Sequence, residues 1–142
     1  MRTVARPLRV LIVDGCPDTT SSCADLLGLY GFEARTAGSG GDALALIDAW
    51  WPDVVMTELR LPGADGFEAA RRIRGRERDG RTVRLVAVTG LATPGYRAAA
   101  WGAGFDHYLV KPADPGVMLG LLRGCAAALS RRPPRPIVAM SS

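Results

Sequence analysis

Cysteine is scarce in this 142-residue sequence, and long apolar runs are missing from it. The three cysteines, Cys16, Cys23 and Cys125, are widely spaced and form no Cys-x-x-Cys pair. We therefore expect reduced thiols and exclude a disulfide or zinc framework. No run approaches the roughly 18 apolar residues that a membrane span requires, and the N-terminus lacks the pattern of a cleaved signal peptide. These absences predict a cytoplasmic protein with no membrane partner.

Lysine is rarer still. Of the 18 basic residues, all are arginine except Lys111. Lysine carries a compact ammonium on a flexible stem, whereas arginine presents a planar fork of donors. In a chain that otherwise uses arginine, Lys111 indicates a position that requires the compact charge.

Basic charge lies mainly at the two ends of the chain. The formal net charge is +4, but two arginines fall in residues 1–7 and three in residues 131–142. Without these five, 13 basic residues stand against 14 acidic residues over 8–130. A nearly neutral body makes nucleic acid an unfavoured partner for it. We predict an N-terminal arm (1–7), a globular domain (8–130) and a disordered, Arg- and Pro-rich tail or linker (131–142).

Five apolar runs alternate with five helical patterns along the globular part. Runs of this length, bounded by turn residues, are typical of strands that are buried on both faces. The alternation predicts an α/β fold, a (βα)5 doubly wound parallel five-stranded sheet with helices on both faces. Charged residues of the third helix are predicted to form a solvated outer face: Arg71, Arg72, Arg74, Glu77 and Arg78. The predicted strands are 8–13, 32–36, 54–57, 83–88 and 106–110, and the predicted helices are 17–30, 42–50, 67–78, 94–102 and 115–129.

Polar side chains follow four of the predicted strands. Asp14 comes after the first strand, Glu58 after the third, Thr89 after the fourth and Lys111 after the fifth. The carboxyl ends of parallel strands meet at one edge of a sheet, where ligands and chemistry are found. Carboxylates can hold a hard divalent cation, while Thr and Lys can hold phosphoryl oxygens. The four residues therefore predict one site.

Four blocks of the sequence together resemble the receiver domain of two-component response regulators. They are VLIVD (10–14), PDVVMTELRLPGADG (52–66), VAVTG (86–90) and AGFDHYLVKP (103–112). The resemblance runs from about residue 9 to residue 122. It implies a flavodoxin-like receiver topology with strand order 2-1-3-4-5, and a role in phosphorelay signal transduction.

The resemblance also implies roles for individual positions. In such receivers an aspartate after strand 3 accepts a phosphoryl group from a histidine kinase. Two acids after strand 1 bind magnesium together with that aspartate and a nearby backbone carbonyl. A hydroxyl after strand 4 and a strand-5 lysine bind the phosphoryl oxygens, and a strand-5 aromatic changes rotamer with the signalling state. These roles fall on Glu58 (acceptor), Asp14 and the Arg60 carbonyl (metal), Thr89 and Lys111 (phosphoryl oxygens) and Tyr108 (switch aromatic).

Two positions depart from the family pattern. Glu58 replaces the phospho-accepting aspartate, and Gly15 replaces the second acid after strand 1. The extra methylene of Glu58 moves its carboxylate by about 1.5 Å, and misplacement on that scale can slow a transfer on the order of 100-fold. Gly15 removes a charge from a magnesium site that normally relies on very few protein oxygens. We expect magnesium to be weakly held or absent, with any contribution from Glu58 weak or lost.

The leading hypothesis is an atypical receiver, or pseudo-receiver, that needs no phosphorylation. Two explanations stand equally: Glu58 imitates the phosphorylated state, or the site has decayed and is kept as a scaffold. A receiver still phosphorylated weakly on Glu58 with Mg²⁺ is the less favoured alternative. We expect no enzyme activity. The expected partner is a histidine kinase or a downstream effector bound through residues 93–129, with a homodimer as a further option.

Two hypotheses come from other classes of protein. A flavodoxin-like cofactor binder would need a phosphate-cradling glycine loop after the first strand, and DGCPDTT (14–20) offers only one glycine. Nucleic-acid binding through the Arg-rich tail would be steeply salt-dependent and would be lost when residues 131–142 are removed.

Overall fold

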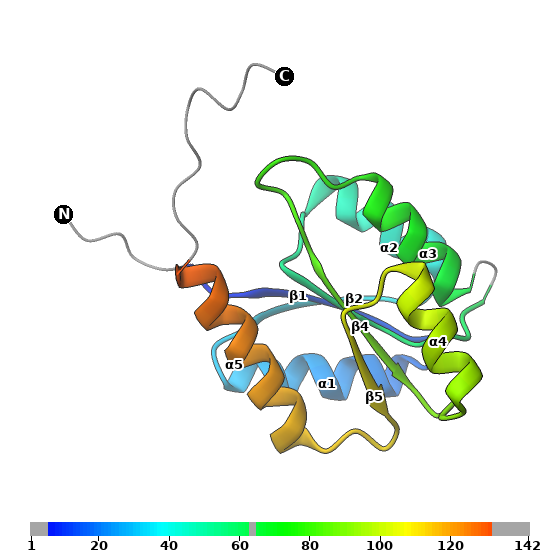
Figure 1. Cartoon of the computed structure of the whole chain (residues 1–142). Coiled ribbons are helices and arrows are strands. Elements are labelled where there is room, and N and C mark those ends of the chain that lie inside the picture. The colour runs from blue at the N-terminus through cyan, green and yellow to red at the C-terminus, as the bar shows by residue number, and fades with distance from the viewer. Residues whose placement is uncertain (1–5, 63–64, 132–142) are drawn as a thin grey trace.

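The five strands form one parallel sheet because each strand is followed by a helix that returns the chain to the same edge. The computed structural model describes residues 6–62 and 65–131. Its strands pair in the order β2-β1-β3-β4-β5, and every pair is parallel. The predicted topology and strand order are confirmed (Figure 1). The strands are β1 (Arg9–Val13), β2 (Glu33–Ala37), β3 (Val54–Thr57), β4 (Arg84–Thr89) and β5 (His107–Val110).

Helices α1 to α5 begin and end close to where the sequence predicts. Ser39 begins α2, because its hydroxyl accepts a hydrogen bond from the Asp42 backbone N–H at 3.1 Å. Gly31 follows α1 with a positive φ of 87°, which glycine adopts without a steric penalty. The helices are α1 (Pro17–Leu29), α2 (Gly40–Ala49), α3 (Gly66–Gly75), α4 (Pro94–Ala103) and α5 (Pro115–Arg131).

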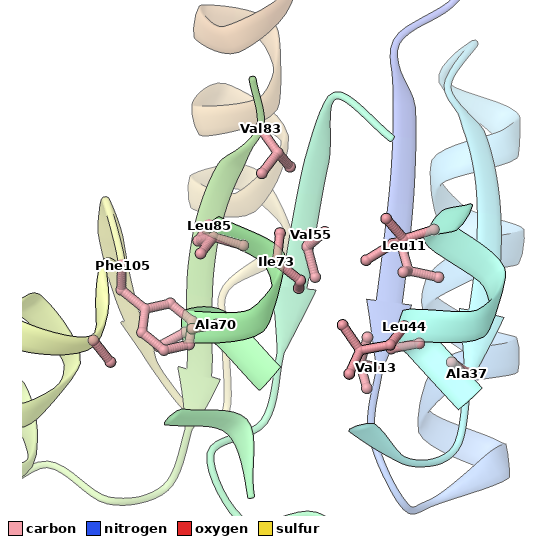
Figure 2. Packing of buried hydrophobic residues seen from close by; sticks show 14 of the residues in the cluster. Leu11, Val13, Ala37, Leu44, Val55, Ala70, Ile73, Val83, Leu85 and Phe105 are labelled. Atoms are coloured by element: carbon pink, nitrogen blue, oxygen red, sulfur yellow. The ribbon is translucent and has the colours of Figure 1, made fainter. Parts of the chain in front are cut away.

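The sheet has one apolar core on each face, since side chains alternate between the faces along a strand. Leu11 and Val13 of β1 pack with residues of α2, α3 and α4. Val10 and Ile12 of the same strand pack with residues of α1 and α5. Figure 2 shows the first of these cores, including Phe105 beside β5. The sheet is therefore rigidly held between helices, and its strand ends are fixed in space.

The prediction of a solvated face was wrong for Arg74 and Glu77, whose side chains are only 26% and 21% exposed. The Arg74 guanidinium donates to the Gly104 carbonyl at 3.0 and 2.6 Å and to the Val83 carbonyl at 2.7 Å. It also pairs with Glu77 at 2.8 Å and with Asp106 at 2.7 Å. Arg74 thus joins α3 to β4 and to the loop between α4 and β5.

The early end of α3 explains this contact. The helix was predicted to reach residue 78, but it ends at Gly75. A turn follows in which the backbones of Arg78 and Arg81 hydrogen-bond each other. Arg74 therefore lies in the last helical turn, from which its long side chain reaches past the helix end.

The predicted arm and tail fall mostly outside the described residues. Arg6 of the arm is described, and its guanidinium donates to both carboxylate oxygens of Asp53 at 2.7 and 2.8 Å. These hydrogen bonds raise the pKa of Arg6. Among the helices of the described residues, none has the length and apolar character needed to cross a membrane.

The Arg74 contacts lead to a stability prediction. Arg74→Met should lower the free energy of unfolding by about 2–3 kcal/mol, because two carbonyls lose their guanidinium donor and two carboxylates lose their ion pair. The matched change Arg72→Met removes an exposed pair with Glu68 and should cost less than about 0.5 kcal/mol. Urea unfolding followed by circular dichroism measures both. Equal losses in the two variants would contradict this role for Arg74.

Candidate functional site

The carboxyl edge of the sheet brings the four predicted polar residues together. Asp14 directly follows β1, Glu58 follows β3 and Lys111 follows β5, while Thr89 is the last residue of β4. The side chains of Asp14 and Glu58 are only 12% and 14% exposed. The four residues lie together at one edge as expected, and the roles assigned to them stay a prediction.

Close backbone packing fixes the position of Glu58. The Gly66 N–H donates to the Leu59 carbonyl at 2.7 Å. A Cβ atom on Gly66 would lie 2.4 Å from the Glu58 carbonyl oxygen, so only glycine fits there. The start of α3 therefore presses against the strand end that carries the carboxylate.

Lys111 bridges the two carboxylates of the site. Its Nζ lies 2.7 Å from Asp14 Oδ2 and 2.9 Å from Glu58 Oε2. A single ammonium can donate in three directions, which suits a position between two acids better than the planar fork of arginine does. This geometry explains why the only lysine of the chain lies here.

The other carboxylate oxygens accept backbone hydrogen bonds. Asp14 Oδ1 accepts from the Cys16 N–H at 3.0 Å, and Glu58 Oε1 accepts from the Leu59 N–H at 2.8 Å. The Thr89 hydroxyl lies near enough to the Glu58 carboxylate to lower its pKa. Both acids are therefore held in place by the chain's own donors.

These contacts shift the ionisation of the pair. Burial alone would raise the pKa of Glu58, but the hydrogen bonds from Thr89 and Lys111 outweigh it and hold that pKa below its ordinary value. Burial likewise disfavours the charged form of Lys111, but hydrogen bonds to Asp14 and Glu58 raise its pKa. Both groups are therefore charged at neutral pH.

A series of contacts leads from Glu58 to the surface of the domain. The Thr89 Oγ1 that contacts Glu58 also accepts from the Leu91 N–H at 3.2 Å. The Leu91 carbonyl in turn accepts from the Tyr108 hydroxyl. Sequence reasoning missed Leu91, because it contributes backbone atoms and its side chain gives no signal.

Tyr108, the predicted switch aromatic, is half-buried at the outer end of this series of contacts. The Arg97 guanidinium lies over its ring at 4.8 Å from the centroid. The Trp101 ring meets it edge-on at 6.4 Å between centroids. Tyr108 therefore contacts the Leu91 carbonyl through its hydroxyl and two residues of α4 through its ring.

The donors available for a divalent cation are few. Gly15 offers no side-chain oxygen, and a Cβ there would meet the Pro62 ring at 3.2 Å. Within residues 6–62 and 65–131, no cluster of three or more Asp, Glu, His or Cys is arranged to hold a metal. Arg60 lies on the rim with Asp14 and Glu58, and its guanidinium reaches toward the Tyr96 hydroxyl at 3.5 Å. A cation would have to share Asp14 and Glu58 with Lys111.

Comparison with known proteins agrees with this geometry. The family model described as the response regulator receiver domain matches residues 10–123. An uncharacterized 14.6 kDa protein of Leptolyngbya boryana is 32% identical over 123 residues, which cover 87% of this chain and 92% of that protein. The transcriptional regulatory protein TcrA of Mycobacterium tuberculosis is 36% identical over 129 residues. That match covers 91% of this chain and 48% of TcrA, so the chain spans about half the length of that relative.

A solved structure shares the architecture. The CheY-like response regulator receiver domain protein of Methanospirillum hungatei superposes with a TM-score of 0.79 at 25% identity. The match covers 88% of this chain and 98% of that one. The predicted fold and the predicted family resemblance are both confirmed.

The bridging ammonium leads to a prediction about pH. Lys111→Met leaves two carboxylates facing each other, which raises the pKa of one of them above its unfolded value. The loss of stability should be about 2 kcal/mol near pH 7.5, less than for a fully buried pair because the Lys111 side chain is 34% exposed. The loss should shrink as pH falls toward about 5, where that acid becomes protonated.

The unmodified protein should respond in the opposite direction. The pKa of Glu58 is lower in the folded protein than in the unfolded chain, so this carboxylate stabilises the fold at pH values above its pKa in the unfolded chain. The stabilisation is lost as the pH falls through the pKa of Glu58 in the folded protein. Urea unfolding at several pH values measures the difference. Arg60→Met, which removes an exposed cation from the same rim, is the control and should leave the pH dependence unchanged. A loss in Lys111→Met that stays constant with pH would contradict the bridge.

Proposed function

The chain belongs to the family of response regulator receiver domains of two-component systems, and on that premise we propose that its signalling surface is held by Glu58 without phosphorylation. A receiver is a signalling module, and we propose that this one acts by binding a protein and not as an enzyme. The fixed negative charge of Glu58 takes the place of the phosphoryl group.

The observation that carries this proposal is a series of contacts in which Thr89 lies beside the Glu58 carboxylate, and hydrogen bonds lead from Thr89 through Leu91 to Tyr108. In the family pattern, Thr89 and Lys111 are the residues that bind phosphoryl oxygens. Here both contact the Glu58 carboxylate instead. The charged Glu58 carboxylate is therefore linked to Tyr108 without a phosphoryl group.

The longer side chain of glutamate suits this role. It places the carboxylate about 1.5 Å further out than aspartate would, where it meets both Thr89 and Lys111. A carboxylate carries one negative charge, whereas a phosphoryl group carries about −1.5 to −2. Glu58 therefore supplies only part of the negative charge of a phosphoryl group. Charge-assisted contacts strengthen the interaction of its carboxylate with its partners.

We also propose that magnesium binds weakly. The residues present do not fit a magnesium site well, because Gly15 supplies no carboxylate and Lys111 occupies one oxygen of both acids. Magnesium needs a near-octahedral set of oxygens and usually keeps several waters. Phosphoryl transfer would then lack a well-placed acceptor carboxylate, and it would also lack the positive charge of magnesium.

The proposed contact surface, residues 93–129, contains α4, β5 and most of α5. Trp101 and Val117 on this surface are 49% and 55% exposed, and aromatic residues are enriched where proteins bind one another. We propose a histidine kinase or an effector protein as the partner. The tail hypothesis concerns residues outside the described part and stays a prediction.

Acetyl phosphate tests the phosphorylation-independent reading. With Mg²⁺, intact mass spectrometry should detect no adduct of about 80 Da on the unmodified protein. An adduct on Glu58 would contradict the proposal.

Reversion of the two atypical positions is the complementary test. The double variant Gly15→Asp, Glu58→Asp should gain the adduct, as the phosphoryl passes to the carboxylate at position 58 and acetate leaves. Gly15→Asn with Glu58→Asp is the matched control, since it fills the same space without the charge, and it should be modified at least about tenfold more slowly. If the double variant gains no adduct, the account of why phosphorylation was lost is wrong.

A further inference from the structure

A pocket lies beside the Asp14–Lys111–Glu58 cluster, on the face of the sheet that α1 and α5 cover. Its volume is about 540 Å³, and small-molecule sites typically measure roughly 300–1,000 Å³. Apolar side chains of three strands line it: Ile12, Met56 and Val88. This pocket shares Glu58, but neither Thr89, Leu91 nor Tyr108, with the series of contacts to Tyr108.

Small residues on α1 open this pocket. The first two turns of α1 present Thr19, Ser22 and Cys23 to it. One turn later the helix carries leucines, of which Leu27 is fully buried in the core. The Cys23 sulfur lies 3.9 Å from the Met118 sulfur of α5. The helix therefore packs tightly at its C-terminal half and leaves space at its N-terminal half.

The pocket is charged at one end only. Asp14, Glu58 and Lys111 are the charged residues that line it among those the structure describes. Two carboxylates and one ammonium leave an excess of one negative charge. Each carboxylate oxygen has two lone pairs, so the acids can accept a further hydrogen bond while Lys111 stays bound.

We propose that this pocket binds a small organic cation. The ammonium group of the ligand would contact Asp14 and Glu58, and its apolar body would cover Ile12, Met56 and Val88. An anion would be repelled by the excess negative charge of the pocket, whereas a neutral molecule would form no ion pair there. The site does not depend on the proposed function, because it exists whether or not Glu58 imitates a phosphoryl group.

Three probes of equal size and different charge test the proposal: cyclohexylmethylamine, cyclohexylmethanol and cyclohexanecarboxylate. Amide NMR of the full chain should show saturable shifts at residues 19–26 and 112–118 with the amine. A dissociation constant on the order of 1 mM is expected for so few atoms. The carboxylate should bind at least about tenfold more weakly. The net charge of +4 favours anions over the molecule as a whole, so a preference for the amine must come from the pocket.

Filling the pocket provides the matched variants. Ser22→Leu and Cys23→Leu should each abolish the shifts, since both side chains line the pocket. Ser21→Leu places the same side chain on the exposed neighbouring position of α1 and should leave binding unchanged. No saturable shift with the amine, equal binding of all three probes, or binding that persists in both pocket-filling variants would overturn the proposal.

Discussion

The contact on which the site depends is the ammonium of Lys111 between two carboxylates. Two partly buried acids at neighbouring strand ends would repel each other, and one positive charge at 2.7 and 2.9 Å offsets that repulsion. Its presence fixes Asp14 and leaves Glu58 oriented toward Thr89. The signalling proposal and the cation pocket both rest on this arrangement, since one uses the Glu58 carboxylate as a fixed charge and the other uses the excess negative charge.

The parallel sheet makes this arrangement possible. The strands run in one direction, so three of the site residues directly follow strands and Thr89 ends one. Helices on both faces hold those ends in register, and Gly66 lets α3 approach Glu58 within a distance that no larger residue permits. Arg74 forms a second contact of α3, with the loop that leads into β5. The site is therefore placed by the fold and not by flexible loops alone.

The sequence predicts the sheet and the meeting of Asp14, Glu58, Thr89 and Lys111, because apolar runs and the polar residues after them are visible in one dimension. It does not predict Arg74, whose role depends on α3 ending at Gly75 and on the reach of a long side chain. Leu91 is invisible for a different reason, since backbone atoms carry no residue signature. The pocket beside α1 is equally hidden, because small residues on a helix face reveal space only after α5 has been placed.

The charge of Glu58 is proposed to hold Tyr108 in place, and fluorine NMR of protein labelled with fluorotyrosine can detect this. Tyr108→Phe identifies the Tyr108 resonance among those of the three tyrosines. Glu58→Met, which removes the acceptor but keeps the length of the side chain, should move or broaden that resonance. Glu68→Met, at an acid of α3 that pairs with Arg72, should leave it in place. A Tyr108 resonance that is the same in Glu58→Met as in the unmodified protein would contradict the account.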